Sequence, residues 1–504
     1  MNNKIYILFL IIVILFVSIL SLRVIPGNFD KDDDAKLLIQ GKTTLEPFQD
    51  VHGNSVFMTT VSIFEEGSAV LTYNRAIAGA RNTGFKGGKF FSLFPLGMSI
   101  ISLPAYSLGH IINFGQGSVW IFMSILAILA SILIFLISSE VFKFSKTISL
   151  TNSLIFSFAS LAWGFSTVLY QHNTAVILIL TMFYAVWKYR ISGKKSFSWA
   201  IISMGLYGIS VFFDYPNLLM MAPIFLYFFL PLEKSDKTYD NKKEKVKIYL
   251  IIISAVLFFL IIISANFLNN SKMYGKWNVM SNTIPLFDGY NFADLIKREN
   301  GSILEQDDIS RNFDKSLIVD NLISVSFAQG RGIFILCPIF LLSILGLYLN
   351  RKKINQEMFV LLSIILVNII IYGMFYNPFG GLSTGTRYFI PTTSILSVFF
   401  GYWLIIPLTR AKKAITLFFI FFSIFNVAAL ALTKVVDNQI VSTSIWGIKN
   451  MTDIMTGISG SVVYNFLFKS WCSLFTYYLF VAAIPCFIIY FVLKKVWSNK
   501  ELYE

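Results

Sequence analysis

The stretch GKFFSLFPLGMSIISLPAYSLGH, from Gly88 to His110, decides how the rest of the chain is placed relative to a membrane. It is apolar enough to cross a bilayer, yet its second residue is Lys89 and it contains Pro95 and Pro104. If it crosses, every later loop lies on one side; if it rests on the surface, every later loop lies on the other. The charges of those loops therefore decide its placement.

The composition is that of a membrane protein. Of 504 residues, 56% are hydrophobic and only 13% are charged, about half the charged share of a soluble domain. Apolar runs of about 20 residues recur along the chain, which predicts an all-α polytopic fold rather than a β-barrel. The first run, IYILFLIIVILFVSILSL (Ile5–Leu22), is longer than the apolar core of a cleaved signal peptide, so we expect a retained span.

Twelve segments are long and apolar enough to be candidate spans, counting the first run and leaving the stretch 92–112 aside. They are 5–24, 117–139, 148–169, 172–189, 198–214, 216–232, 248–268, 332–349, 357–376, 389–407, 413–433 and 477–494. Six basic clusters lie between or after them, at 143–146, 188–195, 233–247, 351–353, 410–413 and 494–500. Short basic loops of membrane proteins lie on the cytoplasmic side.

The parity of the spans then places the doubtful stretch. With Lys4 inside, all six clusters are cytoplasmic if 92–112 does not cross, and all six are external if it does. We therefore expect 92–112 to be an interfacial helix of a plasma-membrane protein with about twelve spans and both termini inside. The net charge of +14 is then a topological excess, and it does not indicate a nucleic-acid partner.

The predicted external parts are larger than the cytoplasmic ones. They comprise a first loop, 25–116, with interfacial helices near 55–66 and 92–112, a second loop, 269–331, and a third, 434–476. Three tight external loops are YQHN (170–173), DYPN (214–217) and NPFGGLSTGTRY (377–388). We divide the chain into a catalytic membrane unit, 1–433, and a terminal unit, 434–504, with an external loop and the last span.

Carboxylates of the first loop are the candidate catalytic groups. Asp50 precedes the expected helix 55–66, and Asp33 and Asp34 belong to the acidic run FDKDDDAKLL. A carboxylate at a membrane surface can act as a general base, and clustered carboxylates can hold a divalent cation or form a solvated stretch. The three cysteines and three histidines are too scattered to define a metal site, and no cofactor is required by the sequence.

Ionisable residues at the outer ends of spans are candidate substrate contacts. Arg387 and Arg331 can each clamp a phosphate or extend to lipid headgroups, and Asp214 closes the span 198–214. His172 and Tyr388 lie in the same kind of tight external loop. The sequence contains no motif of P-loop nucleotide hydrolysis, zinc proteases or serine hydrolases.

The stretch GKFFSLFPLGMSIISLPAYSLG resembles the first-loop motif of the GT-C membrane glycosyltransferases, particularly the aminoarabinose transferases and protein O-mannosyltransferases. NSVFMTTVSIFEEGS, QGRGIFILCPIFLLSILGL and FGGLSTGTRYFIP are similar to further proteins assigned to that superfamily. The resemblance implies that this helix lies on the outer membrane surface, as the charge parity also predicts.

The resemblance also implies a reaction. A sugar on a polyprenyl phosphate would pass, with inversion, to a hydroxyl of a lipid, glycan or protein, with a first-loop Asp as base and cations at the departing phosphate. Asp50, seventeen residues before Gly67, matches the position of the family acid best. The family's acid–Lys pair is Ser92–Leu93 here, so its phosphate contact would be replaced by Lys86, Lys89, Arg331 or Arg387. The alternatives are a transporter or flippase of lipid-linked saccharides and a non-catalytic GT-C relative.

Overall fold

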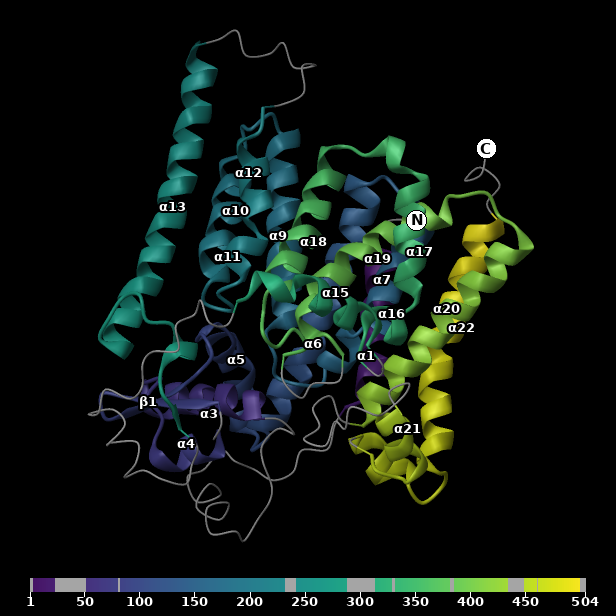
Figure 1. The fold of residues 1–504 in the computed structure, drawn as a ribbon, viewed down its shortest axis with the longest axis horizontal. Coiled ribbons are helices and arrows are strands. Elements are labelled where there is room, and N and C mark those ends of the chain that lie inside the picture. Colours follow the sequence, from purple (N-terminus) through teal and green to yellow (C-terminus); the bar gives the residue numbers. More distant parts are fainter. Residues whose placement is uncertain are drawn as a thin grey trace.

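The computed structural model describes residues 3–22, 51–79, 82–231, 242–287, 313–328, 331–380, 385–433, 448–459 and 461–498 (Figure 1). Helices dominate these ranges, and most of them run side by side in one bundle. A small subdomain containing the strands and the helices of the first loop lies at one end of that bundle.

Seven helices within the described ranges are long and apolar enough to cross a membrane. They are α1 (Asn3–Leu20), α6 (Gly115–Leu136) with the π-helical turn η1 (Ile137–Val141), α9 (His172–Ile191), α13 (Lys242–Tyr274), α18 (Gln356–Gly373), α20 (Arg410–Leu432) and α22 (Leu474–Ser498). These helices support a multi-pass membrane protein.

The other five predicted spans contain helices that are shorter or interrupted. These are α7 (Lys146–Phe158) with α8 (Ala162–Phe165), α10 (Phe197–Ser210), α11 (Asn217–Met220) with α12 (Ala222–Phe229), α16 (Ile333–Leu336) with α17 (Ile339–Leu349), and α19 (Ile390–Leu404). Every predicted span thus has a helix, but the count of twelve crossings is not confirmed, because these pieces fall below the length of about 20 residues that a bilayer requires.

The first external loop forms the subdomain at the end of the bundle. It contains α3 (Val51–Glu66), α4 (Tyr73–Ala78), the hairpin of β1 (Thr83–Lys86) and β2 (Lys89–Ser92), and α5 (Gly97–Ile111). The strand β3 (Leu286–Phe287), from the second loop, pairs antiparallel with β1 and completes a sheet in the order β2-β1-β3. The two predicted external loops therefore fold together.

The first residues of the stretch from Gly88 to His110 form a strand rather than the start of a helix. Lys89–Ser92 pair with Thr83–Lys86, and the turn between them, Gly87–Gly88, has φ of +58° and +74°. Paired left-handed residues match the twist of two-residue hairpins, and glycine adopts them without strain. The helix expected over 92–112 therefore begins only at Gly97, and the helix expected from residue 55 begins already at Val51.

The remaining described elements connect and cap the bundle. They are the short helices η2 (Ser281–Thr283), η4 (Lys315–Leu317), α15 (Ile318–Phe327), η5 (Arg351–Lys353), η6 (Arg387–Phe389), α21 (Ile448–Met455) and η8 (Tyr464–Phe468). In the terminal unit, α22 packs against α7 and α20 of the main bundle.

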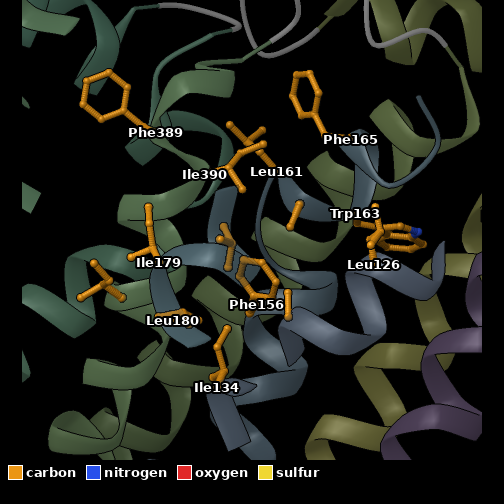
Figure 2. Close-up of a cluster of buried hydrophobic side chains, with 14 of the residues drawn as sticks. Leu126, Ile134, Phe156, Leu161, Trp163, Phe165, Ile179, Leu180, Phe389 and Ile390 are labelled. Carbon is orange, nitrogen blue, oxygen red and sulfur yellow. The ribbon is translucent and has the colours of Figure 1, made fainter. Parts of the chain in front are cut away.

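A buried apolar core lies inside the bundle beside the loops that follow α8 and precede α19 (Figure 2). Leu126 and Ile134 of α6, Phe156 of α7, and Ile179 and Leu180 of α9 meet there. The same cluster includes the side chains at and beside α8 and η6, namely Leu161, Trp163, Phe165, Phe389 and Ile390. The loops that follow α8 and precede α19 therefore stand on a rigid base.

Candidate functional site

The three tight loops predicted on one face do meet at one end of the bundle. Arg387 of η6 lies over the ring of Tyr170, which ends the loop after α8, with its Cζ 4.6 Å from the ring centroid. The carboxylate of Asp214, between α10 and α11, accepts a hydrogen bond from Gln171 Nε2 at 3.4 Å. We call the group of His52, Tyr170, Gln171, His172, Asp214, Tyr372, Arg387 and Tyr388 the loop-end cluster.

Chain direction places this cluster away from the basic loops. Helix α9 begins at His172, in the cluster, and ends beside Lys188 and Arg190. Helix α10 begins just after Lys194 and ends four residues before Asp214. The cluster and the basic segments therefore occupy opposite ends of the same helices.

Arg387 is held by aromatic rings and by a glycine. Its Cζ lies over the ring of Tyr170 and also over that of Tyr388, whose centroid is 5.4 Å away. Aromatic rings in these positions favour the cation. A Cβ atom on Gly380 would lie 3.0 Å from the Arg387 Cζ, so this glycine, at φ +76°, leaves space for the guanidinium. The glycines of FGGLSTGTRY thus have a packing role beside the cation.

Tyr388 extends the aromatic wall of the cluster. Its ring stacks on Tyr372 of α18 with centroids 4.3 Å apart and planes 6° apart. The edge of His172 meets the same Tyr388 ring at 5.5 Å. Residues from α9, α18 and η6 therefore converge on one aromatic surface.

Two buried histidines face the cation. His52 and His172 are each 3% exposed, and the positive charge of Arg387 acts on both. Within the described ranges, His172 Nε2 and the Gln171 Oε1 atom have no hydrogen-bond partner. Buried polar atoms are rarely left unbonded, and such an atom in a cluster marks a place where a ligand can bond.

The first-loop subdomain supplies one wall of the cluster. His52, in the first turn of α3, stacks on Phe94 with centroids 3.5 Å apart and meets the edge of Tyr170 at 4.2 Å. Three residues after Phe94, the N–H of Gly97 donates to the carbonyl of Phe212 at 2.6 Å. The FPLG segment therefore touches both the histidine side and the Asp214 side of the cluster.

Ser92 has a structural task in this arrangement. The Ser55 hydroxyl donates to the carbonyl of Asn82 at 2.7 Å, and its oxygen lies within hydrogen-bond distance, 2.9 Å, of Ser92 Oγ. Both serines are buried, so this contact joins the hairpin to α3. The Ser92 side chain thus anchors the hairpin to α3.

The protonation of the cluster follows from burial and from Arg387. Burial raises the pKa of Asp214 to about 6, although the Gln171 hydrogen bond and the charge of Arg387 favour the ionised form. Burial holds the pKa of His52 well below its usual range, and Arg387 and His172 lower it further, while Gln171 opposes them. At neutral pH the cluster therefore contains a cation, a carboxylate poised near its pKa and a neutral His52.

The other residues predicted from the sequence lie elsewhere or cannot be placed. Asp33, Asp34 and Asp50 fall outside the described residues. Lys86 and Lys89 form the turn end of the hairpin, and its opposite end, Thr83–Ser92, contacts α3. Arg331 lies over the Phe379 ring at 5.3 Å, and Phe379 adjoins the Gly380 that packs against Arg387.

Four members of the cluster, His52, Tyr170, Gln171 and Tyr372, are not among the site residues predicted from the sequence. Tyr170 and Gln171 belong to the tight loop YQHN, and the prediction that this loop shares a face with DYPN is the sequence signal that could identify them. Tyr372 lies within an ordinary apolar helix and offers no sequence signal.

Metal binding has no support from the described side chains. Among them there is no group of three or more His, Cys, Asp or Glu that could hold an ion. The acidic run of the first loop, the other candidate for a cation, is not part of the described ranges.

Comparisons with known proteins give weak likenesses only. No protein-family model matches the chain, and no curated protein matches it either. The archaeal oligosaccharyltransferase AglB from Archaeoglobus fulgidus, in complex with an inhibitory peptide and a dolichol-phosphate, is 14% identical with a TM-score of 0.43; 85% of this chain and 55% of that one are covered.

Two other structures of the Archaeoglobus fulgidus oligosaccharyltransferase give similar values. The apo form is 12% identical with a TM-score of 0.45, covering 91% of this chain and 59% of that one. The complex with zinc and sulfate is 13% identical with a TM-score of 0.41, covering 84% and 52%. The chain thus spans little more than half the length of these proteins, and TM-scores below 0.5 assign it to no family.

Proposed function

We propose that the chain is a GT-C type membrane glycosyltransferase that moves a sugar from a polyprenyl-phosphate donor to a hydroxyl acceptor on the extracytoplasmic face. The observation that carries the proposal is the convergence of Arg387, Asp214 and the buried His172 in one cluster beside the first-loop subdomain. The three loops that supply them were predicted to share the outer face, away from every basic cluster.

Arg387 would bind the donor phosphate. Its planar guanidinium donates paired N–H groups that match phosphate oxygens, and its aromatic neighbours fix its orientation before substrate arrives. As the bond between the sugar carbon and the phosphate oxygen breaks, negative charge gathers on the phosphate. A cation already in place stabilises that charge without reorganisation.

A carboxylate would take the acceptor proton. The acceptor oxygen forms its bond to the sugar carbon while its proton passes to the base, and the polyprenyl phosphate leaves with the bonding electrons. Asp50 is the proposed base, because it precedes His52 of the cluster by two positions in the sequence. Asp214, the carboxylate that the described cluster contains, is the second candidate for this role, since a pKa of about 6 suits a base at neutral pH.

The test is turnover of a defined donor by the reconstituted full chain. Undecaprenyl-phosphate glucose and undecaprenyl-phosphate mannose are supplied in vesicles, and release of undecaprenyl phosphate is measured with a membrane extract as the acceptor source. Arg387→Ala is expected to lower turnover by about 10²–10³-fold, the usual effect of removing a charge-stabilising group. Asp50→Asn is expected to abolish transfer while the protein inserts normally.

Arg351→Ala is the matched control. Arg351 also lies over a tyrosine ring, with its Cζ 4.5 Å from the Tyr348 centroid, but it belongs to a basic cluster at the other end of the bundle. Its loss should leave turnover within about twofold of wild type. Full activity of Arg387→Ala, or equal losses in both variants, would overturn the assignment of the site.

A further inference from the structure

A cavity lies between α1, α7 and α22 at the end of the bundle opposite the loop-end cluster. Its volume is about 420 Å³, and its lining is apolar apart from Lys495 and Thr147. Tyr6 and Phe9 contribute from α1, and Phe491 and Val492 contribute from α22. This cavity takes no part in the proposed sugar transfer, because it is separated from the cluster by the length of the helices.

The three helices are closed at their other end. The carbonyl of Leu20, at the end of α1, accepts hydrogen bonds from the Tyr477 hydroxyl at 2.8 Å and the Ser461 hydroxyl at 2.9 Å. Ser21 Oγ accepts a bond from Trp163 Nε1 at 3.1 Å. Because α1 is pinned there, the space beside Tyr6 and Phe9 is a built feature of the bundle.

Two lysines flank the basic end of the cavity. Lys495 lines it directly, and its side chain is exposed. Lys146 precedes the lining residue Thr147, and its Nζ lies 5.8 Å from the centroid of Phe135. The Phe135 ring in turn stacks on Tyr6, another lining residue, with centroids 5.8 Å apart. Lys495 therefore lines the cavity, and Lys146 lies beside the aromatic pair of Phe135 and Tyr6 that borders it.

The lining of the cavity favours a hydrocarbon occupant, because seven of its nine residues are aliphatic or aromatic. An acyl chain is narrow and apolar, and the side chains around the opening, Ile5 at 51% and Phe491 at 63% exposure, suit a lipid environment. Basic pockets between membrane helices bind anionic lipid headgroups.

We propose that this cavity is a binding site for one anionic phospholipid, with an acyl chain between α1, α7 and α22 and the headgroup phosphate at Lys495 and Lys146. Two interactions would hold this lipid. Its hydrocarbon chain is buried against Phe9, Leu150 and Val492, and its phosphate pairs with the two lysines. A zwitterionic lipid can bury its chain in the same way but pairs only weakly with the lysines.

The test measures which lipid stays with the full-length protein. The protein is reconstituted into nanodiscs of equal parts phosphatidylglycerol and phosphatidylcholine, released in the mass spectrometer, and its retained lipids are identified. One phosphatidylglycerol is expected in excess over phosphatidylcholine, by about fivefold for each lysine that the headgroup pairs with. Glycerol 3-phosphate, the headgroup without acyl chains, is expected not to be retained.

Two variants and a control separate this site from diffuse surface charge. Lys495→Glu should remove the preference for phosphatidylglycerol, and Val492→Trp should remove retention of either lipid by filling the cavity. Lys494→Glu changes the adjacent exposed lysine, which is not part of the lining, and should keep the wild-type preference. Equal retention of both lipids by wild type, equal losses from the two lysine variants, or retention of glycerol 3-phosphate alone would overturn the proposal.

Discussion

The backbone N–H of Gly97 donates to the carbonyl oxygen of Phe212 over 2.6 Å, which joins the first residue of α5 to the loop that carries Asp214. A Cβ atom on Gly97 would lie 2.8 Å from the Phe212 carbonyl carbon, closer than such atoms normally approach. The first-loop subdomain and the Asp214 loop are therefore fixed to each other by a contact that only glycine permits.

Replacing Gly97 by alanine is expected to displace the Asp214 loop and to lower donor turnover by at least about tenfold, because small misplacements of reacting groups are costly. Gly373→Ala is the control, since a Cβ atom there meets its nearest neighbours at 3.7 Å or more, an ordinary contact distance. Turnover and thermal unfolding are measured for both. An unchanged Gly97→Ala enzyme would show that the contact does not position the site.

Hydropathy predicted the helices well and their continuity poorly. Every predicted span contains a helix, because about 20 apolar residues in a bilayer must satisfy their backbone groups internally. The span 332–349 is nevertheless broken at Cys337, since Pro338 has no N–H to continue the preceding turn. Breaks such as that between α7 and α8 depend on tertiary contacts that a hydropathy scan does not contain.

The site was predictable only as a set of loops. Counting charged loops placed YQHN, DYPN and the Arg387 loop on one face, and the structure brings residues from all three together. It was not predictable that His52 would stack on Phe94, because that contact depends on the hairpin between them. The hairpin itself was hidden, since Lys89–Ser92 has the composition of the start of an apolar run. The third strand, β3, pairs with β1 from about 200 residues further along the chain.

The activity should rise with pH around the pKa of Asp214. Burial raises that pKa from 3.8 to about 6, so the ionised carboxylate that faces Arg387 forms only as the pH passes 6. The charged and titratable groups that act on Asp214 or are acted on by it are Arg387, Tyr215 and Tyr372. Turnover of the donor between pH 5 and 8 should show a rising limb near pH 6, which Asp214→Asn should remove together with most of the activity.

The raised pKa of Asp214 lowers the free energy of unfolding as the pH rises, whereas it raises the activity. Because the folded state holds the Asp214 proton more tightly than the unfolded chain, its contribution is complete below about pH 4 and is lost as the pH rises through 6. A change of about two pKa units corresponds to about 3 kcal/mol. Asp214→Asn should therefore be more stable than wild type at pH 7.5, and this advantage should shrink at pH 4.5. For the exposed Asp320→Asn, the difference in stability from wild type should not change in this way.

His172 is expected to bond the substrate directly. Its Nε2 atom is buried in the cluster and lacks a partner among the described side chains, so His172→Ala should lower turnover by about 10²-fold with little change in thermal unfolding. His110→Ala is the control, because His110 packs on Phe64 at 5.0 Å near the C-terminal ends of α5 and α3, whereas His52 lies in the first turn of α3. If both variants lose activity equally, the effect of His172 is one of packing and not of substrate contact.

Arg75 is expected to hold the first-loop subdomain together. Its guanidinium, only 4% exposed, pairs with Glu66 at 2.6 Å and with Glu65, which joins α4 to the end of α3. Arg75→Met should cost about 3 kcal/mol, the lower end for breaking a buried pair, since both carboxylates keep some contact with water. Lys195→Ala removes the pair with Glu244, whose side chains are 45% and 38% exposed, and should cost less than about 1 kcal/mol. Denaturant titration of both variants, followed by proteolysis within residues 51–79, decides the matter: equal stabilities would show that the buried pair does not secure the subdomain.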